Sequence, residues 1–190
     1  MGDLYDDLKA LVGKEGPPVN SVDEVCTQVI RHWCEAIEDD NPLYTDEEYA
    51  KKSKYGSIIA PPTMVVAFPQ PPLWPDGQEV RWRHPQKLSR QESPSPHEVA
   101  MEKLDEAGFT GMFATKVIQE FIRPLFPGDR VIRTTKLVSV TPEKRTSAGS
   151  GHFFTFVFSY SNQKGELICE EIYTLFKFRP REEAPEQGGG

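Results

Sequence analysis

The chain has 190 residues and a mass of 21.5 kDa, which is room for one compact domain or at most two very small ones. With 22 lysine and arginine residues against 29 aspartate and glutamate residues, its net charge is −7. This balance argues against a general nucleic-acid binder or a binder of anionic membranes, because such proteins carry a basic surface. No run of about 18 apolar residues occurs, so we expect no segment that spans a bilayer.

The cysteines, the histidines and the start of the chain together favour a cytoplasmic protein without a metal. Cys26, Cys34 and Cys169 are an odd number without metal-ligand spacing, which suits a reducing compartment. The four histidines are scattered, with no two at ligand spacing, so we expect no metal site. The acidic residues 1–7 are unlike the basic and then apolar start of a signal peptide.

The first part of the chain is predicted to be helical. A short amphipathic helix is expected over residues 3–12. A longer helix should begin at a capping box formed by Ser21 and Glu24, in which each side chain bonds a free amide of the first turn. Apolar residues at helical spacing continue this helix to about Ile37.

Two further helices are expected before the chain changes character. Residues 45–56 indicate a short helix with a capping box between Thr45 and Glu48. Residues 58–68 indicate a buried helix that begins at a proline pair and is cut short by prolines, followed by a proline-rich surface loop over 69–95. Loops of this length inside a compact domain are usually functional or disordered.

A helix with a capping box of Ser95 and Glu98 should run to about Gly108, and strands follow it. The third strand alternates strictly, with four aromatic residues on one face, whereas the fourth is apolar on both faces. Such a strand predicts a sheet with a helix on one face and a partner on the other. We therefore expect an α+β domain over 1–180, and a disordered tail or linker over 181–190. The predicted strands are 112–123, 129–140, 151–162 and 166–178.

The densest polar cluster on this apolar framework is Asp39-Asp40-Asn41-Pro42-Leu43-Tyr44. Its plain interpretation is a helix stop, because Asp, Asn and Pro favour turns. Its functional interpretation is a degenerate catalytic motif. The residues of this segment alone do not decide between the two.

Residues 35–46, Tyr49-Ala50, 56–64 and 123–129 occur in an order that resembles the MaoC-like hot-dog family, which contains the (R)-specific enoyl-CoA hydratases and dehydratases. The resemblance covers most of residues 11–180. It implies a hot-dog fold, in which an antiparallel sheet wraps around a central helix and two such units pair sheet to sheet.

Active members of that family carry Asp-x-Asn-Pro-x-His, whose Asp and His position a water for addition to the enoyl thioester. Here Asp39 and Asn41 match, but Tyr44 stands at the histidine position. A phenol with a pKa of about 10 is a poor base at neutral pH. A proline at Pro62 also removes one amide N–H that could have bound the thioester oxygen. The resemblance therefore predicts no catalytic residue in this chain.

The family includes hot-dog domains that have lost the catalytic residues. Each of these non-catalytic domains pairs with a catalytic one and makes room for a bulky acyl chain. Residues 107–115 further resemble the larger subunit of hydratases that act on steroid side-chain enoyl-CoA thioesters. The resemblance implies a catalytic MaoC-like partner carrying Asp-x-Asn-Pro-x-His, in a heterodimer or heterotetramer. It also suggests a downstream DUF35-type domain and an aldolase as further partners.

The expected substrate contacts follow from the same resemblance, and coenzyme A enters only as part of the thioester, with no separate cofactor. A local basic run that includes Arg81 and Arg83 either is a solvated loop or contacts the phosphates of coenzyme A. Two other functions stay open, an acyl-CoA-binding scaffold without hydratase activity and, with less support, a hot-dog thioesterase. The predicted substrate-binding residues are Tyr44, Pro62, Thr63, Met64, Arg81 and Arg83.

Overall fold

The computed structural model describes residues 4–70 and 94–180. The sheet has strand order β1-β3-β5-β6-β2, and β4 pairs with β5. Every paired strand runs antiparallel to its neighbour. The strands are β1 (Val19–Asn20), β2 (Gly111–Phe121), β3 (Ile132–Val140), β4 (Lys144–Arg145), β5 (Gly149–Ser161) and β6 (Leu167–Pro180).

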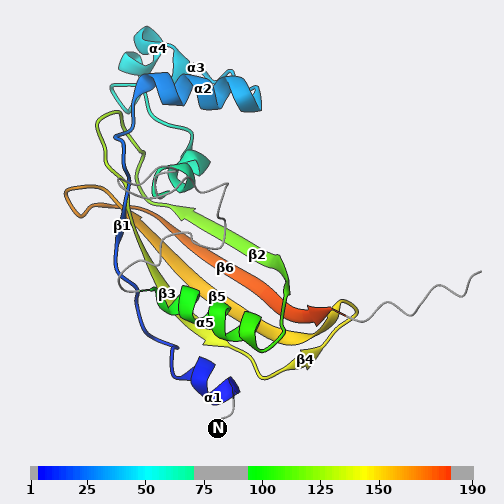
Figure 1. Cartoon of the computed structure of the whole chain (residues 1–190). Coiled ribbons are helices and arrows are strands. Elements are labelled where there is room, and N and C mark those ends of the chain that lie inside the picture. The colour runs from blue at the N-terminus through cyan, green and yellow to red at the C-terminus, as the bar shows by residue number, and fades with distance from the viewer. Residues whose placement is uncertain (1–3, 71–93, 181–190) are drawn as a thin grey trace, which may run out of the picture.

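The helical segments lie at two places along the sheet. Figure 1 shows α5 lying across the strands near α1, and α2, α3 and α4 gathered beyond the other end of the sheet. The α+β class and the four long strands predicted from the sequence are therefore confirmed. The helices are α1 (Leu4–Lys9), α2 (Thr27–Ile37), α3 (Pro42–Thr45), α4 (Glu47–Lys52), the 3₁₀ helix η1 (Pro62–Ala67) and α5 (Pro96–Glu106).

Two clusters of buried side chains form the core on the same face of the sheet. One joins α1 and α5 to the sheet and includes Leu8, Leu104 and Phe156. The other joins α2 and η1 to the far end of β5 and β6, and includes Ile30, Met64 and Tyr160. The predicted alternation of β5 is present, because Phe154, Phe156 and Tyr160 are buried on this face while Thr155 and Ser159 point to the other.

Two of the expected helix starts are wrong, and in each case a different hydrogen bond replaces the predicted cap. The hydroxyl of Ser21 accepts from the Val131 amide at 3.1 Å, and α2 starts at Thr27, without a side-chain cap. The helix expected from Thr45 begins only at Glu47, as α4, while Pro42–Thr45 form the separate helix α3, and Asp46 caps α4 by accepting from the Tyr49 amide. In contrast, the predicted capping box of Ser95 and Glu98 is present at the start of α5.

The helix expected over 58–68 is shorter and tighter than predicted. Only Pro62–Ala67 are helical, and they form a 3₁₀ helix rather than an α-helix. Prolines precede and follow it, and six residues between such breaks favour i→i+3 bonds over a longer α-helical ladder. The rest of the proline-rich loop, residues 71–93, lies outside the described residues, as does the predicted tail over 181–190.

Candidate functional site

The turn that carries the degenerate motif uses its polar side chains to bond its own backbone. Asp39 accepts from the amide of Asn41 at 3.1 Å, and Asn41 accepts from the amide of Leu43 at 3.1 Å. Glu38, with φ of 57°, ends α2 just before them. The helix-stop interpretation of this segment therefore describes its local structure.

Tyr44 is the residue that the resemblance places at the histidine position, and its surroundings keep its phenol neutral. The side chain is half-buried and packs against the core cluster that contains Met64. Burial raises the pKa of the Tyr44 hydroxyl above its usual value of 10.0, and the nearby Asp39 carboxylate raises it further. At neutral pH this group is a hydrogen-bond donor, not a base.

The structure separates the predicted site residues between two depressions of the surface. Asp39 lines a shallow groove of about 500 Å³ together with Arg31, Glu35 and Asp40. Pro62 lines a cavity of about 270 Å³. Tyr44 is in neither of these two linings, but its hydroxyl is influenced by Asp39 of the groove and by Tyr55 of the Pro62 cavity. The other residues of the Pro62 cavity are Lys54, Tyr55, Ile59, Ala60, Phe121, Ile122, Arg123, Pro124, Leu125 and Ile168.

The predicted contacts on η1 differ in their access to solvent. Pro62 and Thr63 are exposed, whereas Met64 is fully buried in the core. The segment before η1 is fixed to the loop between β2 and β3, because the amide of Ala60 donates to the carbonyl of Leu125 at 2.8 Å. Arg81 and Arg83 lie outside the described residues, so their contact with coenzyme A stays a prediction.

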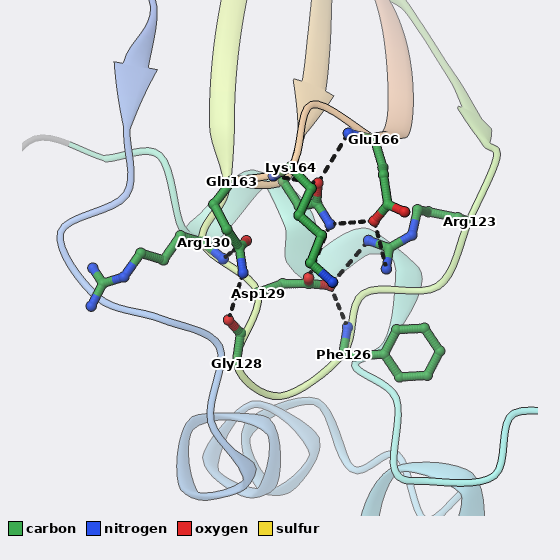
Figure 2. Close-up of polar contacts among 9 residues, drawn as sticks. Arg123, Phe126, Gly128, Asp129, Arg130, Gln163, Lys164 and Glu166 are labelled. Atoms are coloured by element: carbon green, nitrogen blue, oxygen red, sulfur yellow. Dashed lines mark hydrogen bonds and ion pairs between the residues drawn. The ribbon is translucent and has the colours of Figure 1, made fainter.

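A buried carboxylate holds the loop between β2 and β3 that forms one wall of the Pro62 cavity (Figure 2). Asp129 accepts from the Arg123 guanidinium at 3.1 Å, the Phe126 amide at 3.0 Å and the Asn162 side chain at 3.2 Å. Glu166 accepts from Asn162 and lies 3.5 Å from Arg123. Because these groups pair with one another, the charge of Arg123 is neutralised and the loop is tied to the β5–β6 hairpin.

Some residues of interest are not found by sequence reasoning. Lys54, whose ammonium lies 4.9 Å from the ring centre of Tyr55, lines the Pro62 cavity but follows no chemical pattern in the sequence. Glu171 is buried within β6, and the one signal that could have found it is a pair of acidic residues inside an otherwise apolar strand. Within residues 4–70 and 94–180, no group of three histidine, cysteine or acidic residues could hold a metal ion.

No helix in the part of the chain that the structure describes is long and apolar enough to cross a membrane.

Comparison with known proteins places this architecture among dehydratases and hydratases. The family model described as "FAS1-like, dehydratase domain region" matches residues 10–171. The "Probable enoyl-CoA hydratase alpha subunit" of Thermomonospora curvata is 34% identical over 179 residues, which are 92% of this chain and 51% of that protein. The "3-oxo-4,17-pregnadiene-20-carboxyl-CoA hydratase alpha subunit" of Mycobacterium tuberculosis is 29% identical over 160 residues, 83% of this chain and 46% of that protein. The chain thus spans about half the length of these two relatives.

A solved structure resembles this chain over almost its whole length. In the crystal structure of the ChsH1-ChsH2 complex from Mycobacterium tuberculosis, the matching chain superposes with a TM-score of 0.78 and 25% sequence identity. The match covers 97% of this chain and 98% of that chain.

Proposed function

Because the chain belongs to the FAS1-like dehydratase family, whose members share the MaoC-like hot-dog fold, we propose that it is the non-catalytic subunit of a heteromeric enoyl-CoA hydratase. In this role it forms part of the acyl pocket, while a second chain supplies the Asp and His that add water across the double bond. The family and the hot-dog fold expected from the sequence are confirmed. The division of labour between two chains is the proposal.

The observation that carries the proposal is the state of the motif between Asp39 and Tyr44. Hydration needs a group that takes a proton from water near neutral pH. Tyr44 has a raised pKa, and the side chains of Asp39 and Asn41 are hydrogen-bonded to backbone amides of the turn. The chain has Tyr44 rather than a histidine at this place, which supports a base supplied by another chain.

The partner that we propose is a MaoC-like subunit carrying Asp-x-Asn-Pro-x-His, in a heterodimer or heterotetramer. Strand β2 supports this, because among the described residues only β6 pairs with it and its other edge is free. Five of its residues are exposed and strongly apolar, which is unusual for an edge strand of a chain that works alone. They are Met112, Phe113, Val117, Ile118 and Phe121.

The substrate that we propose is a bulky, steroid side-chain 2-enoyl-CoA. One relative is named for a pregnadiene carboxyl-CoA hydratase, and its alpha subunit is similar to this chain over most of the chain's length. The DUF35-type domain and the aldolase stay predictions of the same kind.

The test is hydration of a bulky enoyl-CoA, followed by loss of absorbance of the conjugated thioester. We expect no turnover by the purified chain and full turnover after mixing with a catalytic MaoC-like subunit. The matched control replaces the motif His of that subunit by Ala, which should abolish activity of the mixture. Full activity of the purified chain would overturn the proposal, and a mixture that binds acyl-CoA without hydrating it would favour the scaffold function instead.

The predicted contact of Arg81 and Arg83 with coenzyme A has its own test in the active mixture. Reversal of both charges to glutamate should raise the KM for the thioester with little change in kcat, because the phosphates of coenzyme A are anionic. An unchanged KM would mean that this basic run is a solvated loop.

A further inference from the structure

A line of polar side chains crosses the helix-covered face of the sheet, and neither the motif nor the Pro62 cavity includes it. We call Arg133 on β3, Tyr160 on β5, Glu171 on β6 and Gln119 on β2 the polar ladder. Arg133 is directly opposite Tyr160, and Glu171 is directly opposite Gln119. Since Glu171 is also opposite Phe158, it lies diagonally beside Tyr160 on the same face.

Part of the polar ladder is satisfied internally, and part of it is not. The Gln119 amide donates to the Glu171 carboxylate at 2.5 Å. The guanidinium of Arg133 lies 5.6 Å from the ring centre of Phe158, and its Nε is buried with no hydrogen-bond partner among the described residues. A buried N–H without an acceptor is destabilising, because it has lost its hydrogen bond to water and gained none in return. Each such group in a folded protein calls for an explanation, and a bound water or ligand is one of them.

A second donor is beside this one. Burial raises the pKa of the Tyr160 hydroxyl strongly, and the Glu171 carboxylate raises it further, so the hydroxyl keeps its proton. Tyr160 is directly across from Arg133, and its side chain is 3% exposed. The Arg133 guanidinium is itself a hydrogen-bond partner of the Tyr160 hydroxyl, whose oxygen accepts from it. The Nε–H of Arg133 and the O–H of Tyr160 are then the two donors, from adjacent strands, that the polar ladder presents to a further acceptor. Two convergent donors suit an oxygen atom with two lone pairs.

The charge balance decides which kind of oxygen fits. Arg133 and the buried Glu171 both act on Tyr160 and carry opposite charges, so the polar ladder is formally neutral. His97 of α5 packs edge-on against Phe156, and burial lowers its pKa, so it adds no charge at neutral pH. A carboxylate or phosphate would bring an uncompensated charge into this buried place, whereas a ketone or hydroxyl would not.

The surroundings describe the rest of the ligand. Phe158 packs against both core clusters, so the polar ladder lies between the apolar side chains of α5 and those of α2 and η1. A polar line between two apolar clusters is complementary to a large hydrocarbon that carries a single oxygen.

We propose that the polar ladder recognises a neutral oxygen, a ketone or a hydroxyl, on the acyl group of the substrate, with the Nε–H of Arg133 and the O–H of Tyr160 as donors. The inference rests on the proposed function, because only an acyl-CoA-binding subunit would receive such a group here. It names Arg133 and Tyr160 as specificity residues and assigns them no part in the addition of water.

The experiment measures affinity in the assembled complex with two saturated polycyclic acyl-CoA thioesters, one carrying a ring ketone and the other a methylene at that position. Titration calorimetry should show about tenfold tighter binding of the ketone, the expected effect of hydrogen bonds to a buried donor pair. Arg133→Met and Tyr160→Phe should each reduce this preference for the ketone without weakening the binding of the methylene compound. Lys136→Met, an exposed cation of β3 on the opposite face, should leave the preference unchanged.

The outcomes separate the inference from the proposed function. Equal affinity for the two thioesters in the wild-type complex, or a preference that survives both substitutions, would overturn the inference alone. Failure of both thioesters to bind would overturn the proposed function and the inference with it. If Arg133→Met does not fold, Tyr160→Phe preserves the packing of the ring and decides the matter by itself.

Discussion

The two edges of the sheet are built in opposite ways. Along β3, the chain covers the outer edge with its own N-terminal segment: Gly13 donates to Leu137, Gly16 donates to Thr135, and Ser21 donates to Val131. Strand β1 and a bridge between Glu15 and Lys136 complete this pairing. We call this the closed edge.

The edge along β2 has no such cover among the described residues, and we call it the open edge. Strand β2 is 11 residues long and exposed along nearly its whole length. Figure 1 shows it at the margin of the sheet, beside β6. Val117 is 51% exposed and Ile118 is 42% exposed, although they point to opposite faces.

The difference between the two edges indicates where a second chain would pair with the sheet. Proteins protect edge strands with charges, prolines, bulges or covering segments, because a free apolar edge pairs with other chains. This chain protects one edge with its own N-terminal segment, so the exposure of the other is specific to that edge. The open edge is consequently the place at which we expect the catalytic partner, whereas the sequence pattern had suggested the face of the sheet.

The largest effect should follow from charge at the open edge. The double substitution V117D/I118D should weaken binding of the catalytic subunit by at least about a hundredfold, because two carboxylates would be buried without partners in the interface. The fold of the chain itself should persist, since both side chains are exposed. Sedimentation of the mixture and hydratase activity measure the effect.

The control for this prediction is on the closed edge. Val138 of β3 is 44% exposed, which matches the two positions on β2. Val138→Asp should leave the affinity for the partner within about twofold, because surface substitutions away from an interface have small effects. If V117D/I118D binds the partner as the wild type does, the open edge is not the interface.

The next effect concerns the loop that leads from the open edge to the closed edge. Asp129→Ala should lower the free energy of unfolding by about 2–4 kcal/mol, because it removes a part-buried acceptor shared by the Arg123 guanidinium, the Phe126 amide and the Asn162 side chain, and leaves Arg123 and Asn162 with Glu166 alone. Urea denaturation of the isolated chain measures this. Glu24→Ala, which removes an exposed ion pair with Arg130 at 3.9 Å, should change stability by less than about 1 kcal/mol. Equal losses for the two variants would contradict a structural role for the Asp129 network.

Much of the fold could be predicted because its signals are local. The period of two in β5 and the capping box of Ser95 and Glu98 depend only on neighbouring residues, and both are present. The cap predicted at Ser21 is wrong because its hydroxyl bonds the amide of Val131, 110 positions away. No local pattern reveals that competition between a cap and a distant amide.

In the candidate site, too, local features could be predicted from the sequence and features that depend on distant residues could not. The resemblance identifies Tyr44 at the histidine position, and local turn chemistry explains the bonds of Asp39 and Asn41. The polar ladder could not be found, because Gln119, Tyr160 and Glu171 come together only through the register of separate strands.

A smaller effect tests whether β2 stays in place without a partner. Cys169 of β6 is directly opposite Phe121 at the end of the open edge. Burial, and then the carboxylates of Glu171 and Glu170, raises the pKa of the Cys169 thiol from 9.0 to about 11. Stability from this group is complete below pH 9.0 and is lost as the pH rises toward 11, because the unfolded thiol ionises first. Thermal melts over this range should fall less steeply for Cys169→Ala.

Alkylation of the native chain gives an independent measurement of the same protection. At pH 8 we expect iodoacetamide to label the half-buried Cys26 well before Cys169, because the thiolate is the reactive form. Labelling of Cys169 as fast as Cys26 would mean that the open edge separates from β6 when no partner is present.

The smallest effect should come from substitution of Tyr44, the residue that first indicated a non-catalytic subunit. If the base is supplied across the open edge, the hydroxyl of Tyr44 contributes no proton transfer, and Tyr44→Phe should change kcat of the assembled complex by less than about twofold. The ring would still pack against the core cluster that contains Met64, so stability should hold. The pH–rate profile should also be unchanged, since the raised pKa of Tyr44 keeps the phenol protonated at neutral pH. A hundredfold loss of kcat with unchanged partner binding would instead place chemistry on this side of the interface, and the two chains would then share the catalytic work.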